Sequence, residues 1–181
     1  DRRALLLGVI VSAFEGSMYA FVFHWTPALR SDTIPPPHGV IFALFMMACA
    51  CGASVSTLVS GWVKPTARLS AAVAAGCVAF VMCTCAATGD AEDHLGFSFS
   101  AFLLIEFCVG VYFPSMGVLK SDIVPEHVRG TVYNLYRVPL NALVVGLLLS
   151  DITMATCFKL NALLLFAALA GVMRIRSSQY E

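Results

Sequence analysis

Long apolar stretches dominate the chain, and short polar or proline-rich segments interrupt them at regular intervals. Six of the stretches are long enough to cross a bilayer, which takes about 20 apolar residues in a helix. They lie at approximately 4–29, 39–63, 67–88, 97–118, 130–150 and 155–173. The pattern predicts an all-α membrane protein, with six transmembrane helices in one domain that occupies residues 1–181.

The composition supports this class and excludes a soluble domain. Hydrophobic residues make up 59% of the chain and charged residues 12%, about half the charged share of an ordinary soluble domain. We expect the apolar helices to lie in the lipid bilayer, and we do not expect the chain to bind nucleic acid.

Basic residues concentrate on one side of the predicted membrane topology. The opposite side holds only Arg30 and Lys159. Such a bias marks the cytoplasmic side, so we expect both termini of this segment to be cytoplasmic, in the plasma membrane. The residues on that side are Arg2, Arg3, Lys64, Arg68, Lys120, Arg129, Arg174 and Arg176.

Three ionisable residues, Glu15, Glu106 and Arg137, lie near the middle of predicted spans. A charge at that depth costs several kcal/mol, so it usually faces a partner or a water-filled cavity. Two acids and one base near the midplane indicate a polar pathway, as in a transporter.

The placement of the two acids also indicates an internal repeat. Glu15 lies in the first span of the first three, and Glu106 in the first span of the last three. The two triplets run in opposite directions, and inverted three-plus-three repeats are typical of transporters, with the site near the midplane.

The fifth span carries a polar face. Asn134, Arg137 and Asn141 are spaced i, i+3 and i+7, which places them on one side of a helix, and Tyr133 lies one turn before Arg137. Arginine cannot lose its proton in a protein, so at this depth it needs an anion. These donors suit a tetrahedral oxyanion. The alternative is a buried pair that only fixes helix register, with Glu106 as the favoured counter-ion.

On the first span, Ser12, Glu15 and Tyr19 share a face in the same way. Tyr19 joins the predicted substrate-binding residues. Glu15 and Glu106 are candidates for counter-ions or proton-coupling groups. Each could instead be a protonated carboxyl that donates to a backbone carbonyl.

Prolines and small residues predict how the helices are shaped and packed. Pro114 and Pro139 each remove a helical hydrogen bond, and we expect both to kink their spans beside the polar residues. Two small-residue stripes at four-residue spacing predict close helix packing. They are Gly52, Ser56 and Ser60 on the second span, and Ala71, Ala75 and Ala79 on the third.

No catalytic, metal or cofactor site is predicted. The pairs Cys49/Cys51 and Cys83/Cys85 lie within helices, where residues two apart point about 200° away from each other and cannot ligate one metal ion together. No Gly-x-Ser-x-Gly motif occurs, and the four histidines lie toward helix ends or loops. We therefore do not expect an enzyme.

Several segments resemble the molybdate-anion transporter family, a branch of the major facilitator superfamily. Residues 15–29 (EGSMYAFVFHWTPAL) resemble its seventh helix. Residues 107–117 (FCVGVYFPSMG) and 125–130 (PEHVRG) resemble its tenth helix and the loop that follows, and 136–141 (YRVPLN) its eleventh.

The resemblance implies the C-terminal six-helix half of a twelve-helix carrier, with the N-terminal half absent from this chain as its partner. Such a carrier would move molybdate, a tetrahedral dianion, by rocking two halves around a central site. Two other interpretations stay open: a carrier of another solute, such as a sugar or an organic anion, and a membrane sensor or scaffold that transports nothing.

Overall fold

The computed structural model describes residues 2–31, 35–89 and 94–177. Within these ranges the secondary structure is entirely helical, and each long helix is long and apolar enough to cross a membrane. The prediction of six spans is confirmed. The helices are α1 (Arg2–Ala28), α2 (His38–Leu58), α3 (Pro65–Thr88), α4 (His94–Ile123), the 3-10 helix η1 (Glu126–Val128), α5 (Arg129–Leu149) and α6 (Met154–Ser177).

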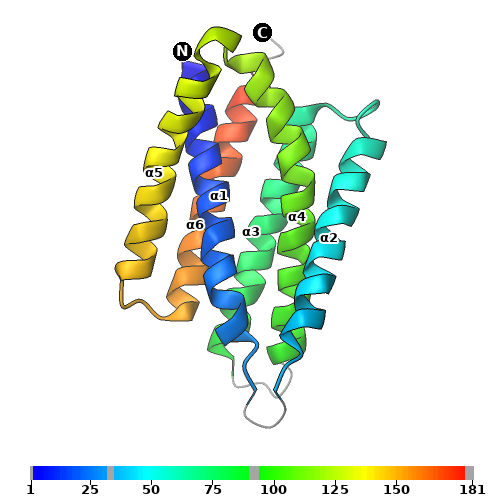
Figure 1. The fold of residues 1–181 in the computed structure, drawn as a ribbon, viewed down its shortest axis with the longest axis vertical. Coiled ribbons are helices and arrows are strands. Elements are labelled where there is room, and N and C mark those ends of the chain that lie inside the picture. The colour runs from blue at the N-terminus through cyan, green and yellow to red at the C-terminus, as the bar shows by residue number, and fades with distance from the viewer. Residues whose placement is uncertain (1, 32–34, 90–93, 178–181) are drawn as a thin grey trace.

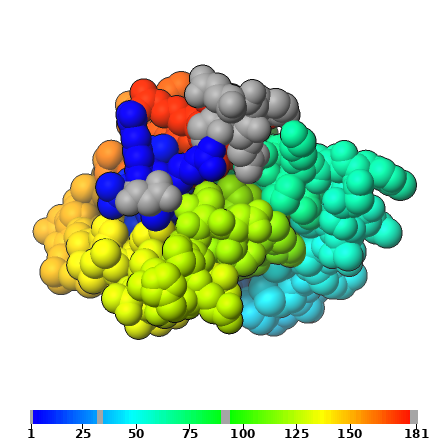
Figure 2. Space-filling view, turned by 90° about the horizontal axis from the view of Figure 1, so that it is seen from above, coloured from blue at the N-terminus to red at the C-terminus, as the bar shows by residue number. Residues whose placement is uncertain are grey.

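The helices form an antiparallel bundle in which α1 and α4 are central (Figure 1). The start of α1, the end of α6 and the α2–α3 and α4–α5 connections lie at one end, which we call the terminal end. Seen from that end, α5 and the α2–α3 pair lie on opposite sides of α4 (Figure 2).

The helix contacts follow the predicted inverted repeat. The principal contacts within the described helices are α1 with α4, α5 and α6, α4 with α2 and α3, and α3 with α6. Exchanging α1 with α4, α2 with α5 and α3 with α6 reproduces this same set. In both halves of the repeat, therefore, the second helix packs mainly against the first helix of the other half.

An aromatic cluster closes the end of the bundle opposite the terminal end. The Phe21 ring lies 5.6 Å from that of Phe45 and 5.2 Å from that of Phe102. Phe158 of α6 lies 6.1 Å from Phe102. All four side chains are buried. Because aromatic rings bury large areas and interact favourably edge to face, this cluster joins α1, α2, α4 and α6.

The largest differences from the predicted helix ends are in the second and fourth helices. The second helix ends at Leu58, before the predicted end at 63, because the chain turns through residues 59–62. The fourth continues to Ile123, five residues beyond 118. Hydropathy marks the apolar part of a helix, whereas α4 continues through Lys120, whose side chain turns back into the bundle.

The backbones of α2 and α4 touch through two glycines. A Cβ added to Gly52 would clash with the carbonyl oxygen of Phe107, and one added to Gly110 would clash with that of Cys49. Ser56, one turn after Gly52, is fully buried, whereas Ser60 is exposed. The packing role predicted for the second-span stripe is therefore confirmed at Gly52 and Ser56.

This contact predicts that Gly110→Leu lowers the thermal unfolding temperature of the purified protein in detergent. The added side chain must push α2 away from α4, and overpacking of this kind costs about 1–3 kcal/mol. Gly117→Leu is the matched control, since no atom lies near a Cβ added at Gly117 on the same helix. Equal unfolding temperatures for the two variants would contradict the close contact.

Candidate functional site

An ion pair and a hydrogen bond join α1 and α4 inside the bundle. Oε1 of Glu15 lies 3.4 Å from Nζ of Lys120 and accepts a hydrogen bond of 3.0 Å from the hydroxyl of Tyr112. The Lys120 and Glu15 side chains are 20% and 19% exposed. The pair is therefore shielded from bulk solvent, although a solute can still reach it.

The sequence of α4 aligns these groups. Tyr112, Met116 and Lys120 are four residues apart and share one face of the helix. The Tyr112 ring stacks on Phe14 with centroids 4.0 Å apart and an angle of 7° between the planes. This stacking holds the Tyr112 hydroxyl beside Glu15, which follows Phe14 in α1.

Helix α5 adds an aromatic wall to the same cluster. Nζ of Lys120 lies 5.4 Å from the centroid of the Tyr133 ring, a distance at which the ring face attracts a cation. The Tyr133 and Tyr136 rings stack with centroids 6.4 Å apart. Lys120 is thus held by a carboxylate from α1 and an aromatic face from α5.

This cluster can bind an anion by exchange. An ammonium offers three donors and a tyrosine hydroxyl one more. In the structure the Glu15 carboxylate pairs with the Lys120 ammonium. An incoming anion could take the place of this carboxylate, and Lys120 would still have a counter-ion. We call Glu15, Tyr112, Lys120 and Tyr133 the central cluster.

The structure places Arg137, Asn134 and Asn141 elsewhere, on the exposed face of α5. Tyr19 is 41% exposed, one turn along α1 from Glu15. Of the predicted substrate-binding residues, only Tyr133 lies in the central cluster. The contribution of the other four to binding stays a prediction.

Glu106 lies at a different interface. Its side chain is 7% exposed on α4, and Cys49 of α2 lies close enough to feel its charge. Among the residues that the structure describes, Glu106 forms no ion pair with Arg137. The expected pairing of these two residues is therefore wrong for this conformation, because Glu106 faces α2 whereas Arg137 points out of the bundle.

Both predicted kink prolines lie inside continuous helices, α4 and α5. In each helix the carbonyl three residues before the proline accepts a serine hydroxyl. Ser115 donates to Val111 at 2.8 Å, and Ser12 of α1 donates to Tyr136 at 3.2 Å. The carbonyl that loses its N–H donor at a proline is the one four residues before it, so neither bond replaces the missing one. The predicted bending stays a prediction.

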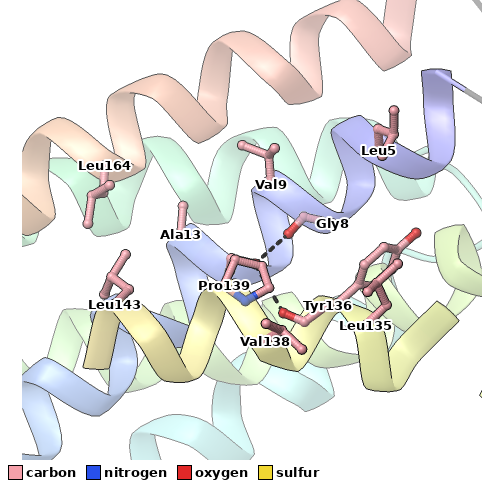
Figure 3. A pocket seen from close by; sticks show the side chains of 11 residues that line it. Leu5, Gly8, Val9, Ala13, Leu135, Tyr136, Val138, Pro139, Leu143 and Leu164 are labelled. Carbon is pink, nitrogen blue, oxygen red and sulfur yellow. Dashed lines mark hydrogen bonds between the residues drawn. The ribbon is translucent and has the colours of Figure 1, made fainter. Parts of the chain in front are cut away.

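Pro139 borders an apolar cavity of about 420 Å³ between α1, α5 and α6. Figure 3 shows Leu5, Val9 and Leu143 around it, and its dashed lines end at the carbonyls of Gly8 and Tyr136. These two carbonyls share the hydroxyl of Ser12 as their donor. Its walls carry no charged side chain. This cavity suits hydrocarbon better than an anion.

Sequence reasoning missed Lys120 and Tyr112, and treated Arg68 as one more cytoplasmic charge. The predicted fourth span ends at 118, which places Lys120 outside the membrane on the cytoplasmic side. The four-residue spacing from Tyr112 to Lys120 was the available signal. In residues 2–31, 35–89 and 94–177, no three His, Cys, Asp or Glu side chains are grouped to hold a metal ion.

Comparison with known proteins identifies the family. Residues 1–107 match a family described as sugar transporters with 12 transmembrane helices, which is more than half of the chain. The molybdate-anion transporter of Xenopus tropicalis is 38% identical over 97% of the chain and 40% of its own length. That of Danio rerio is 36% identical over 82% of the chain and 31% of its own length.

The chain therefore spans less than half the length of these relatives. Among solved structures, the in meso crystal structure of PepTSo, a POT family transporter, covers 97% of this chain and 37% of its own. Its TM-score is 0.74 at 13% identity, which shows a shared fold.

These matches and the six apolar helices show that the chain belongs to an integral membrane protein. The relatives are transporters, which agrees with the prediction that the chain is not an enzyme. The helix motifs, the family match and the curated relatives together show that the chain belongs to the molybdate-anion transporter family of the major facilitator superfamily.

Proposed function

We propose that this chain is the C-terminal half of a secondary transporter that moves molybdate, or a similar tetrahedral oxyanion, by alternating access. The names of its relatives support the cargo. The observation that carries the proposal is Lys120, a shielded cation that a single carboxylate holds at 3.4 Å among tyrosine side chains.

The exposed surface of α5 supports a second six-helix half. Only Tyr136 and Leu140 are buried on this helix. Its exposed face carries Arg137, Asn134 and Asn141, and a charge in contact with lipid at this depth costs several kcal/mol. The N-terminal half of the same protein would cover this face and complete a central cavity.

In the proposed cycle, Glu15 neutralises Lys120 while the site is empty. An oxyanion displaces the carboxylate and accepts hydrogen bonds from Lys120 and from the hydroxyls of Tyr112 and Tyr133. Arg137 supplies a second positive charge from α5, which matches a dianion, and Asn134, Asn141 and Tyr19 add neutral donors. Because the ligand binds the conformations with different affinity, it shifts the balance between them.

Glu106 is the proposed proton-coupling residue. It is buried between α4 and α2, and within the described residues it has no hydrogen-bond partner. Burial of an ionised carboxylate in this setting costs free energy, whereas the protonated, neutral carboxyl carries a much smaller cost. Protonation of Glu106 would favour the closed contact between α2 and α4. Release of the proton to water would accompany separation of these two helices.

The proposed orientation places the terminal end in the cytoplasm of a cell whose plasma membrane holds the carrier. The bias of basic residues toward that end supports this orientation. Two of the eight residues counted there, Lys120 and Arg68, turn into the bundle.

A sugar or organic-anion carrier is the second candidate, because the matching family is described as sugar transporters. The central cluster would bind a carboxylate or hydroxyl groups with the same donors. Competition of unlabelled solutes against molybdate uptake separates these cargoes. A sensor or scaffold would show no uptake of any of them.

The first functional prediction concerns Lys120. In a host without its own molybdate carriers, the full-length protein should take up molybdate, and Lys120→Gln should reduce uptake at low substrate by about tenfold or more, since a hydrogen bond to a charge contributes about 1.5–3 kcal/mol. Lys159→Gln, an exposed lysine at the other end of the bundle, is the matched control. Wild-type uptake by a correctly inserted Lys120→Gln protein would exclude the central cluster as the site.

Arg137 is tested separately, because it lies on the face that the second half would cover. Arg137→Gln should weaken molybdate uptake by about tenfold, with sulfate as competitor in a parallel arm. Uptake that depends on Arg137 and resists sulfate supports a selective oxyanion site between the halves. If the variant matches wild type while Lys120→Gln fails, the site lies within this half alone.

Glu106→Gln should uncouple transport from protons. In proteoliposomes, wild-type uptake should respond to an imposed pH gradient, whereas the variant should exchange molybdate without that response. Gln resembles the protonated carboxyl and cannot release a proton. Glu126→Gln, in the exposed η1 turn, is the control. A Glu106→Gln protein that still responds to the gradient would remove this residue from the coupling mechanism.

A further inference from the structure

A buried cation, Arg68, lies where α2, α3 and α4 meet, outside the central cluster. Its Nη1 donates to the carbonyl oxygen of Ser56 at 2.7 Å and to the Ser56 hydroxyl at 3.0 Å. The Ser56 hydroxyl in turn lies 3.4 Å from that of Ser115 on α4. The Arg68 side chain is 7% exposed, so solvent does little to stabilise its charge.

The charge of Arg68 is not neutralised by the part of the chain that the structure describes. Both of its hydrogen bonds there go to Ser56, a neutral residue. Its Nε is buried and has no hydrogen-bond partner among the described residues. An isolated buried charge costs several kcal/mol, which an anion on the free side of the guanidinium would offset.

Arg68 borders a groove of about 310 Å³ between these three helices. Arg68 and Ser56 are the polar side chains of its lining, and the rest of the wall is apolar. Ala71 and Ala75 follow Arg68 at i+3 and i+7 on one face of α3, and Phe107 and Val111 face them from α4. The groove therefore joins one cationic group to a hydrocarbon-like channel.

We propose that this groove binds one anionic phospholipid, with its phosphate on Arg68 and an acyl chain along Ala71 and Ala75. Arg68 lies in the first turn of α3, at the terminal end, and the groove extends from there toward Cys108 in the middle of α4. A lipid has the same polarity, with its headgroup at the membrane surface and its chain toward the centre.

The inverted repeat provides an internal comparison. The groove between α2, α3 and α4 corresponds to the cavity between α5, α6 and α1 shown in Figure 3. The corresponding cavity has an apolar wall with no charged residue. Only the groove with Arg68 selects an anionic headgroup, so one copy of the repeat binds this lipid tightly and the other does not.

The test is native mass spectrometry of the full-length protein in detergent, after delipidation, with phosphatidylglycerol or phosphatidylcholine added. Wild type should retain one tightly bound phosphatidylglycerol in preference to phosphatidylcholine. Arg68→Gln should weaken this binding by about tenfold or more, as expected for a lost charge-assisted hydrogen bond. Arg176→Gln, an exposed arginine at the same end, should not.

A second variant protects the test against misfolding of Arg68→Gln. Ala75→Leu fills the groove without touching the guanidinium, and it should reduce phosphatidylglycerol retention. Ala87→Leu, exposed on the same helix, should leave it unchanged. If Arg68→Gln and Ala75→Leu both retained phosphatidylglycerol as well as wild type does, the proposal would be overturned. So would displacement of the lipid by millimolar inorganic phosphate, which would identify a site for a free anion.

Discussion

The cost of burying charge organises this bundle from its middle to the terminal end. Glu15 and Lys120 can both lie inside it because each neutralises the other at 3.4 Å, and either alone would cost several kcal/mol. Their contact sets the relation of α1 to α4, which the Tyr112 hydroxyl and its stacking on Phe14 reinforce. Lys120 reaches Glu15 from the part of α4 that stays helical beyond its apolar segment.

The two ends of the bundle are held by different forces. At the end opposite the termini, buried aromatic rings join four helices, and such contacts are lost only by exposing large apolar surfaces. From the middle of the bundle to the terminal end, an ion pair and hydrogen bonds join α1, α4 and α5. Polar contacts can be exchanged for contacts with a ligand or with water at little net change in free energy. The terminal end is therefore the one suited to respond to a bound anion.

Much of the fold follows from the sequence, because hydrophobic length and charge position are one-dimensional properties. Six spans, the inverted repeat and the basic terminal end could all be predicted. The partners of the charged residues could not. Spacing shows that Arg137 shares a face with Asn134 and Asn141, but it does not show which helix that face meets, so it cannot identify the counter-ion of Arg137. Lys120 and Arg68 looked like surface charges because their side chains fold back from the helix ends.

Tyr133 lies close to both cations of the proposed substrate site, Lys120 and Arg137. Its ring lies under Lys120, and Arg137 follows one turn later on α5. An anion beside Tyr133 would therefore meet donors from α4 and α5 together. Helix α5 is also weakly held, with two buried side chains, and an element with few buried contacts moves at low cost. Substrate that draws Lys120 and Arg137 toward one anion would thus act on α5, the helix that the second half of the carrier would contact.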